Sequence, residues 1–231
     1  MTDDSGTAAM ESLYPFLYAE TSDLPAVLEE VRASTVAKAT EIAELRQVIA
    51  QRDGARIVRC AGEMAARFAA GGRLFAFGNG GSATDAAQLA TLFLHPGSLS
   101  AGEAAPPLPA FGLANDTSVV TALCNDIGVD VVFSRQLGAF GRSGDIAVGL
   151  STSGNSANLL RAFDEASRRG MLTIGLAGYE GGKMAELSSI DYLFDAPSAS
   201  IHRIQEAQTT IYQVLWELTA QEVSRVPRDT G

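Results

Sequence analysis

The sequence contains little cysteine and histidine, and its basic side chains are outnumbered by acidic ones. It has two cysteines, two histidines, 17 lysines and arginines, and 27 aspartates and glutamates in 231 residues, for a net charge of −10. Cys60 and Cys124 lack the spacing of a metal site, so we expect them to be small buried residues. The acidic balance disfavours direct binding to nucleic acid, because such binding needs clustered lysines and arginines.

Long apolar runs are also missing. No uninterrupted apolar stretch approaches the length that crosses a membrane, although the apolar fraction of 46% is ordinary for a globular protein. The first residues do not show the basic and then apolar pattern of a signal peptide. We therefore expect a cytoplasmic protein without membrane contact, long enough for one α/β domain and an added helical segment.

Two short loops of small polar residues are the most informative feature that is present. Residues 78–82 read Gly-Asn-Gly-Gly-Ser, and residues 151–156 read Ser-Thr-Ser-Gly-Asn-Ser. Each loop follows an apolar, strand-like segment and precedes a segment with helical periodicity. Small side chains at the start of a helix leave N–H groups and hydroxyls free to bind phosphate or sugar oxygens. One glycine-rich turn is often only a tight turn, but two such loops favour a polyhydroxylated anionic ligand.

From residue 73 onward, strand-like and helical segments alternate along the chain. This rhythm predicts an α/β fold with a parallel sheet covered by helices on both faces. Such sheets bind ligands at the carboxyl ends of their strands, where both polar loops fall. The expected strands are 74–77, 110–113, 146–150, 172–176 and 192–194. The expected helices are 83–94, 117–123, 129–140, 157–169, 183–187 and about 201–223.

The rest of the chain divides into an arm, a helical segment and a tail. We expect a flexible arm over 1–20, a helical segment over 21–70, the α/β domain over 71–225 and a tail over 226–231. The helical pattern pauses at Asp53-Gly54 and resumes at Ile57. Its apolar face serves either internal packing or, as we favour, a seam between subunits. The segment 96–109, rich in Gly, Ala and Pro, is a surface loop or a lid.

Four motifs in order along the chain resemble those of the sugar isomerase (SIS) domain. They are 78–82, 151–156, Gly-Tyr-Glu-Gly-Gly-Lys-Met at 178–184 and Arg-Ile-Gln-Glu at 203–206. Within this family the chain is most similar to the phosphoheptose isomerase branch, whose members convert sedoheptulose 7-phosphate to a heptose 7-phosphate. The same branch includes the DnaA initiator-associating protein. The resemblance spans residues 25 to 222. It implies a single SIS domain with a five-stranded parallel sheet between helices, a flavodoxin-like three-layer arrangement with an N-terminal helical extension.

The resemblance also implies which residues hold the ligand, a sugar phosphate. The first loop faces the sugar, and the hydroxyls of the second form a cradle for the phosphate. An acidic turn accepts hydrogen bonds from sugar hydroxyls, and a glutamine contacts the substrate. The matching residues are Asn79, Gly80, Gly81, Ser82, Asn115, Asp116, Ser151, Thr152, Ser153, Ser156 and Gln205. Family members form homotetramers with sites at subunit interfaces, so a homo-oligomer, dimer or tetramer, is expected.

The chain departs from the isomerases at the residues that surround their zinc ion. Those enzymes carry a His and a Glu on the helix after the first loop, and a Gln and a His on the last helix. The matching residues here are Gln88, Leu92, Gln205 and Gln213. Two neutral amides and a leucine do not make an ordinary zinc site, so we predict no metal here and no other cofactor.

Aldose–ketose isomerisation needs a base beside a carbonyl and an acid that returns the proton. Leu92 and Gln213 can do neither, so the activity requires substitutes. Asp85 and Glu206 match carboxylates common in the family. The plainer interpretation of Asp85 is a helix-start charge or a tie to the loop, and that of Glu206 is a structural ion pair. The two histidines are more plausible as surface or capping residues. The four candidates are Asp85, Glu206, His95 and His202.

Three hypotheses follow for the function. The first is a divergent, metal-free phosphoheptose isomerase-like enzyme that acts on a heptulose phosphate. The second is a non-catalytic protein that senses a phosphosugar or binds a partner, like the DnaA initiator-associating protein. The third is one subunit of a mixed oligomer whose other chain supplies the missing residues. We favour the first, because the ligand contacts are retained almost completely although fold alone does not decide function.

Overall fold

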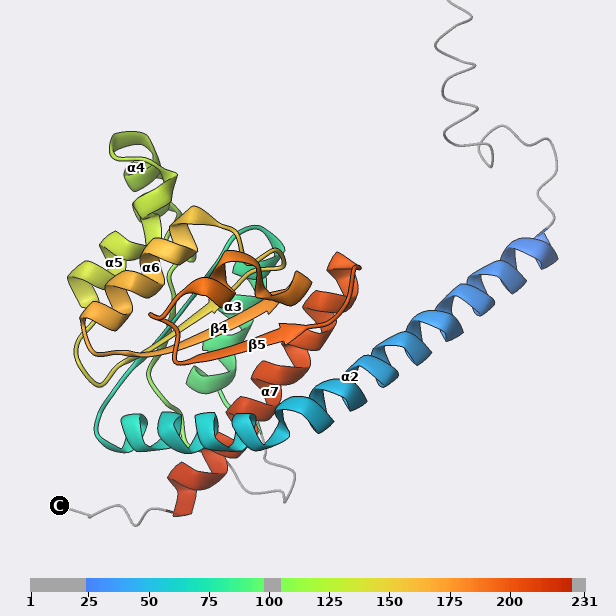
Figure 1. Cartoon of the computed structure of the whole chain (residues 1–231), viewed down its shortest axis with the longest axis horizontal. Helices are drawn as coiled ribbons and strands as arrows, with labels where there is room; N and C mark the ends of the chain where they lie inside the picture. The colour runs from blue at the N-terminus through green and yellow to red at the C-terminus, as the bar shows by residue number, and fades with distance from the viewer. Residues whose placement is uncertain (1–23, 98–104, 226–231) are drawn as a thin grey trace, which may run out of the picture. The chain divides into compact units, whose positions relative to one another are not determined.

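A five-stranded, all-parallel sheet with strand order β2-β1-β3-β4-β5 forms the centre of the α/β unit (Figure 1). The expected fold class is confirmed, and each expected strand is present. The central strands β1, β3 and β4 are buried along their whole length, as expected for strands covered on both faces. The strands are β1 Leu74–Gly78, β2 Ala110–Gly112, β3 Ile146–Leu150, β4 Leu172–Gly178 and β5 Tyr192–Ala196.

The computed structural model describes residues 24–97 and 105–225. The expected arm over 1–20, the tail over 226–231 and the middle of the 96–109 excursion therefore lie outside the described residues. No helix within the described ranges is both long and apolar enough to cross a membrane.

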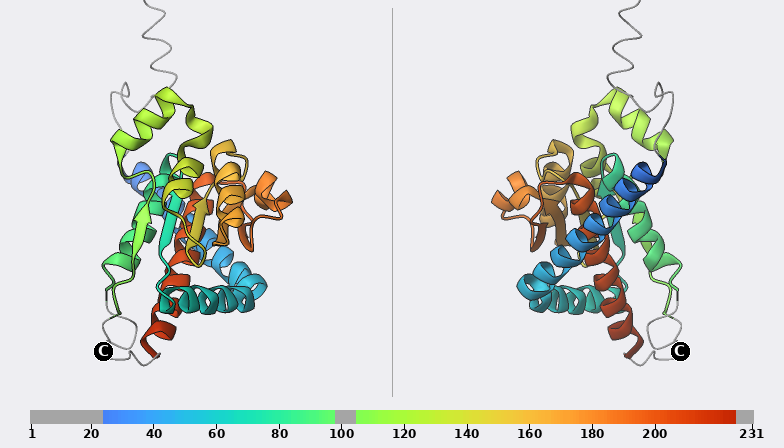
Figure 2. Two further views of the ribbon diagram at one scale, coloured as in Figure 1. Left: turned by 90° about the vertical axis from the view of Figure 1, so that its left-hand side faces the viewer. Right: turned by 90° about the vertical axis from the view of Figure 1, so that its right-hand side faces the viewer.

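Helices cover both faces of the sheet (Figures 1 and 2). On one face, α5 and α6 pack on β1 and β3, where the Phe77 ring lies 5.5 Å from that of Phe133 and 5.3 Å from that of Phe163. On the other face α3 and α7 pack together, and α7 lies so close to β4 that a Cβ at Gly178 would meet Ile204 at 2.4 Å. The elements after β1 are α3 Gly81–Leu94, α4 Thr117–Asp126, the 3₁₀ helix η2 Val129–Val131, α5 Val132–Phe140, α6 Ala157–Arg168, the 3₁₀ helix η3 Tyr179–Glu186 and α7 Ile201–Arg225.

The helix α2, Leu24–Ala69, is continuous, so the predicted pause at Asp53-Gly54 is wrong. The Asp53 carboxylate is buried and ion-paired with Arg52 at 2.7 Å and Arg56 at 3.0 Å. The Asp53 side chain is therefore paired with arginines of the same helix, and α2 continues through this position. A single glycine inside a helix costs only about 1 kcal/mol relative to alanine, which these contacts offset.

The chain forms two units that meet between Ala43 and Glu44, within α2. In the first unit the described residues are 24–43, where Leu24, Leu28 and Val31 are exposed apolar residues. In the second unit the remainder of α2 belongs to the core, and the Thr219 hydroxyl of α7 donates to the Ala61 carbonyl. The predicted role of the helical segment 21–70 as a subunit seam stays a prediction.

The segment expected to be helical over 183–187 forms η3 instead. Its backbone turns through positive φ at Glu180 (61°), Gly181 (87°) and Gly182 (51°). These three residues precede the expected helix and kink the chain after β4, so only a short 3₁₀ stretch follows before Leu187. This turn is positioned by contacts with the loop after β3, described below. The segment expected as one helix over 129–140 is divided into η2 and α5.

Candidate functional site

The two polar loops lie side by side at the carboxyl edge of the sheet. β1 and β3 are direct neighbours, with Gly78 in register with Leu150, so the loops that follow them meet. The strand order reverses here, since β2 lies on one side of β1 and β3 on the other. Such a switch point is where open α/β sheets bind ligands. The expected position of the ligand site therefore rests on this topology.

A small cavity between the loops is lined by six of the residues expected to contact the ligand. Its volume is about 100 Å³. Pockets that enclose a whole ligand measure about 300–1,000 Å³, so this cavity suits one phosphate group of a larger ligand. We call it the cradle; its lining residues are Asn79, Ser82, Leu150, Ser151, Thr152, Ser153 and Ser156.

The hydrogen bonding of the cradle leaves its hydroxyl protons free. The Ser151 Oγ accepts from the Gly154 N–H at 3.0 Å, and the Ser153 Oγ accepts from the Asn155 N–H at 3.3 Å. Ser156 is the N-cap residue of α6, and its side chain makes no capping bond. Hydroxyls that accept within the loop keep their own protons for a ligand. The helix α6, whose first N–H groups have no intrahelical acceptor, begins directly after Ser156 of the cradle.

An amide pair joins the first loop to α6. The Asn79 Nδ2 donates to the Asn158 Oδ1, and the Asn158 Nδ2 donates to the Asn79 Oδ1, both at 2.9 Å. Asn158 is 5% exposed. The Asn79 side chain therefore holds the two loops together, in addition to lining the cradle. Sequence analysis missed Asn158, and its position two residues after the second loop was the only available signal.

Replacing Asn158 with aspartate is expected to lower the free energy of unfolding by about 1–3 kcal/mol, because a carboxylate cannot donate to the Asn79 Oδ1 and leaves it unpaired. Urea denaturation followed by circular dichroism measures this. The same amide-to-acid change at the exposed Gln51 is the control and should stay within about 0.5 kcal/mol. Equal losses in both variants would contradict a specific role for the amide pair.

The helix α7, on the face of the sheet opposite to α5 and α6, contacts both loops. The Gln208 side chain is fully buried, and its Nε2 donates to the Ser151 carbonyl at 3.0 Å. Gln205 lies against the first loop, since a Cβ at Gly81 would meet its Nε2 at 2.6 Å. Gln205 thus lies beside the first loop, and its contact with the ligand stays a prediction. Gln208 was missed because its partner is distant in sequence.

The motif over 178–184 braces the second loop. The Met184 N–H donates to the Gly154 carbonyl at 3.0 Å, and the Lys183 N–H donates to the Asn155 Oδ1 at 3.0 Å. The two backbones approach so closely that a Cβ at Gly154 would lie 1.9 Å from the Gly181 oxygen. This motif therefore acts on the cradle through backbone packing.

Asn115 and Asp116 do not line the cradle. The Asn115 amide lies against the strand end, where a Cβ at Gly112 would meet its Nδ2 at 2.8 Å. The Asp116 Oδ1 accepts from the Val119 N–H at 3.1 Å and thereby caps α4. Their contacts with sugar hydroxyls stay a prediction.

Asp85 is the carboxylate with the most perturbed surroundings near the loops. It lies one turn after Ser82 on α3, on the same side of the helix. Burial raises the pKa of Asp85. Burial also raises the pKa of Tyr212 on α7, and the negative charge of Asp85 raises it further. The Tyr212 hydroxyl is buried without a partner among the described residues, so α3 and α7 place a carboxyl and a phenol near each other.

The other candidates for proton transfer have structural roles or lie at helix ends. Glu206 forms an ion pair with Arg203. His95 is the C-cap of α3, where its N–H donates to the Thr91 carbonyl, and His202 is exposed in the first turn of α7. The expectation that both histidines are surface or capping residues is confirmed. Cys60 is buried as expected, whereas Cys124 is only half-buried.

The residues at the family's zinc positions do not suit a metal. Gln88 and Gln213 are exposed amides, and Leu92 is half-buried. Within residues 24–97 and 105–225, no group of three or more His, Cys, Asp or Glu side chains could hold a metal ion. This donor set does not fit zinc, and the absence of a metal in the working protein stays a prediction.

Comparisons with known proteins agree with the fold. The SIS domain model matches residues 39–178. The phosphoheptose isomerase of Nitratidesulfovibrio vulgaris (strain DSM 19637 / Miyazaki F) is 40% identical over 191 residues, 83% of this chain and 89% of the relative. That of Pelodictyon phaeoclathratiforme is 44% identical over 176 residues, 76% and 82% of the two chains.

A solved structure gives the same result. The phosphoheptose isomerase GmhA from Neisseria gonorrhoeae superimposes with a TM-score of 0.74 at 34% identity, covering 83% of this chain and 99% of that one.

Proposed function

The chain belongs to the SIS domain family, in its phosphoheptose isomerase-like branch, and on this premise we propose that it isomerises a sugar phosphate, sedoheptulose 7-phosphate, held by its phosphate in the cradle. The observation that carries the proposal is the cradle itself. Two hydroxyl-rich loops meet at the switch point of the sheet, at the N-terminus of α6. This arrangement favours a phosphate monoester over an uncharged sugar.

With the phosphate in the cradle, the sugar chain extends beyond the small cavity toward the edge between α3 and α7. Gln205 lies beside the first loop on that side, and its amide can both donate to and accept from sugar hydroxyls. Asp85 lies on α3, one turn after Ser82 of the cradle. We propose that the reacting sugar carbons lie beside Asp85 when the phosphate is anchored between the loops.

We assign the proton transfer to Asp85. A base removes a proton from the carbon next to the carbonyl, which gives an enediol, and the same group returns the proton to the former carbonyl carbon. One hydroxyl proton moves between the two oxygens, so atoms and charge balance. A carboxyl group whose pKa is raised by burial is a stronger base than an exposed carboxylate. No step requires the zinc that the residues do not fit.

The non-catalytic alternative rests on one observation. Leu92 and Gln213, which replace the family's acid and base, have no titratable proton. A protein that retained the cradle and lost turnover would sense or present the phosphosugar. Both the isomerase proposal and the non-catalytic alternative include a homo-oligomer and a cytoplasmic location.

Proton NMR of sedoheptulose 7-phosphate with purified protein tests turnover. The wild-type protein is expected to produce the aldose signal without added zinc. Asp85→Asn should slow the reaction by at least about 100-fold, the usual contribution of a general base, while ligand affinity changes only a few-fold. Asp126→Asn, at the exposed end of α4, is the matched control and should keep the wild-type rate.

Two other outcomes would change the proposal. If the NMR signals of sedoheptulose 7-phosphate broaden on binding but no aldose signal forms, the isomerase proposal is wrong and the non-catalytic alternative takes its place. Full activity in Asp85→Asn would keep the isomerase and reject Asp85 as its base.

A further inference from the structure

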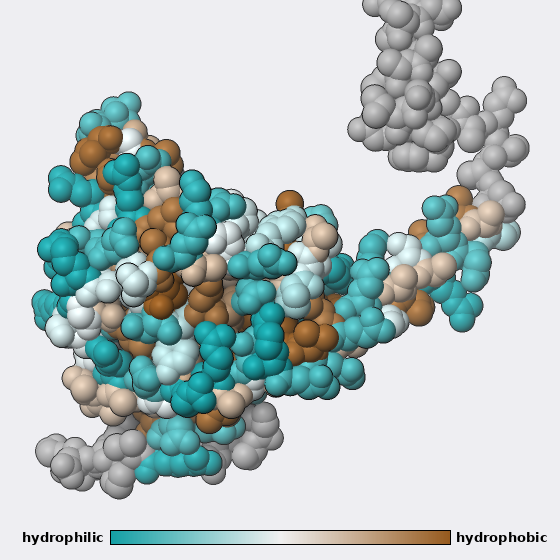
Figure 3. Space-filling model, viewed as in Figure 1, coloured by the Kyte–Doolittle hydropathy of each residue, from teal (hydrophilic) through white to brown (hydrophobic). Residues whose placement is uncertain are grey.

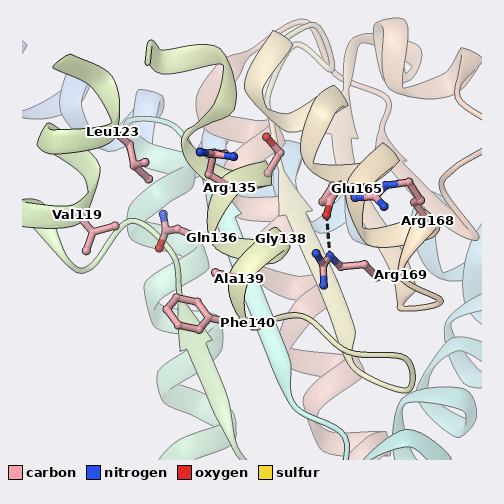
Figure 4. Close-up of a pocket in the computed structure, with 11 residues that line it drawn as sticks. Val119, Leu123, Arg135, Gln136, Gly138, Ala139, Phe140, Glu165, Arg168 and Arg169 are labelled. Carbon is pink, nitrogen blue, oxygen red and sulfur yellow. Dashed lines mark hydrogen bonds and ion pairs between the residues drawn. The ribbon is translucent and has the colours of Figure 1, made fainter. Parts of the chain in front are cut away.

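A second hollow, larger than the cradle, is a cavity of about 620 Å³ between α4, α5 and α6 (Figure 4). We call it the arginine cavity. Its volume lies within the range of about 300–1,000 Å³ for small-molecule sites. It is lined by Val119, Leu123, Ser134, Arg135, Gln136, Gly138, Ala139, Phe140, Glu165, Arg168 and Arg169.

The charges in the arginine cavity are mostly positive in a chain of net charge −10. Glu165 binds two arginines: Arg168 by an ion pair, and Arg169, whose Nε lies 2.6 Å from the Glu165 Oε1. Burial acts to raise the pKa of Glu165, but the hydrogen bonds from these arginines outweigh it and lower the pKa. Glu165 therefore stays ionised, and three arginines against one glutamate leave two positive charges for an anion.

Arg135 is the arginine most available to a ligand. It is exposed on α5 and makes no hydrogen bond or ion pair with any residue in the described ranges. Arg169, by contrast, also donates to the Gly141 carbonyl at 3.0 Å, which ties α6 to the end of α5. A free guanidinium beside a fixed one suits a phosphate or pyrophosphate, which accepts from several donors at once.

The opposite wall of the arginine cavity is apolar. Val119 and Leu123 of α4 and Phe140 of α5 lie across from Glu165 and its arginines (Figure 4). Phe140 is 55% exposed. None of the residues of α4 is buried, and apolar side chains gather over this part of the surface (Figure 3). An exposed apolar wall facing a basic one matches a ligand with a flat apolar ring and an anionic group.

The arginine cavity is separate from the cradle. The cradle lies at the start of α6, whereas Glu165, Arg168 and Arg169 lie at its end. Twelve helical residues at about 1.5 Å each place the two sites roughly 18 Å apart. We propose that the arginine cavity binds a phosphate-bearing anion with an apolar ring, of the nucleoside diphosphate class. This second site is independent of the isomerase proposal.

Isothermal titration calorimetry with ADP, inorganic pyrophosphate and adenosine tests the proposal. ADP is expected to bind more tightly than pyrophosphate, because only ADP also covers the apolar wall, and adenosine should bind weakly. Arg135→Gln should weaken ADP binding by at least about tenfold through the lost charged hydrogen bonds. Ala139→Trp, which fills the cavity and keeps its charge, should weaken it similarly.

Two further variants locate the site. Arg225→Gln makes the same charge change at an exposed arginine on α7 and should leave ADP binding unchanged. Ser153→Glu blocks the cradle and should also leave ADP binding unchanged. ADP binding that is lost in Ser153→Glu but kept in Arg135→Gln would place the ligand in the cradle and overturn the proposal. So would the absence of ADP binding at millimolar concentration, or equal losses in Arg135→Gln and Arg225→Gln.

Discussion

Replacing Ser153 with glutamate is expected to reduce the affinity for sedoheptulose 7-phosphate by more than 100-fold. Ser153 lines the cradle, so the new carboxylate would occupy the space of the phosphate and repel it. Two like charges about 4 Å apart at the protein surface repel by about 4 kcal/mol, close to a thousandfold in affinity. Titration calorimetry of the variant with the sugar phosphate measures the loss directly.

A matched substitution separates the local effect from a change in overall charge. Ser167→Glu adds the same side chain at an exposed position near the other end of α6. It should bind sedoheptulose 7-phosphate within about twofold of wild type, because surface charges farther apart than about 10 Å are largely screened at 0.1 M salt. Unchanged affinity in Ser153→Glu would mean that the phosphate binds elsewhere.

The parallel sheet and the edge at which the two loops fall follow from patterns that are local in sequence. A strand buried on both faces is almost wholly apolar, and β1, β3 and β4 are, apart from Thr173 of β4, whose hydroxyl donates to the Asp191 carboxylate. The chain must then cross over before the next parallel strand, which accounts for the alternation with helices. Because loops after neighbouring parallel strands share one edge, the serines and Asn79 of the two motifs could be predicted to meet.

The supports of the cradle could not be predicted in the same way. The Asn79–Asn158 pair spans 79 residues, and the bond from Gln208 to the Ser151 carbonyl spans 57. Such bonds depend on how α6 and α7 pack on the sheet, and a buried amide in a helix has no pattern of its own. The continuity of α2 through Asp53 has the same cause, since a local turn signal was outweighed by ion pairs with neighbouring arginines.

The backbone contact between the second loop and η3 should be the most sensitive point of the fold. Gly154 has a φ of +66°, and a Cβ there would lie 1.9 Å from the Gly181 oxygen and 2.5 Å from its carbonyl carbon. Gly154→Ala is therefore expected to lower the free energy of unfolding by about 3 kcal/mol or more. About 1–2 kcal/mol comes from the left-handed backbone and the rest from displacing η3. Urea denaturation measures the change.

Gly62→Ala is the control, because Gly62 is exposed within α2 and a Cβ there would meet nothing within 4 Å. The same substitution should there stabilise the fold by about 0.5–1 kcal/mol through helix propensity. Opposite signs would show that the loss at Gly154 comes from its left-handed backbone and its contact with η3, rather than from the removal of a glycine as such. A Gly154→Ala protein as stable as wild type would mean that η3 can move away from the new Cβ without a cost in stability. The Met184 bond to the Gly154 carbonyl could then not hold the cradle in place.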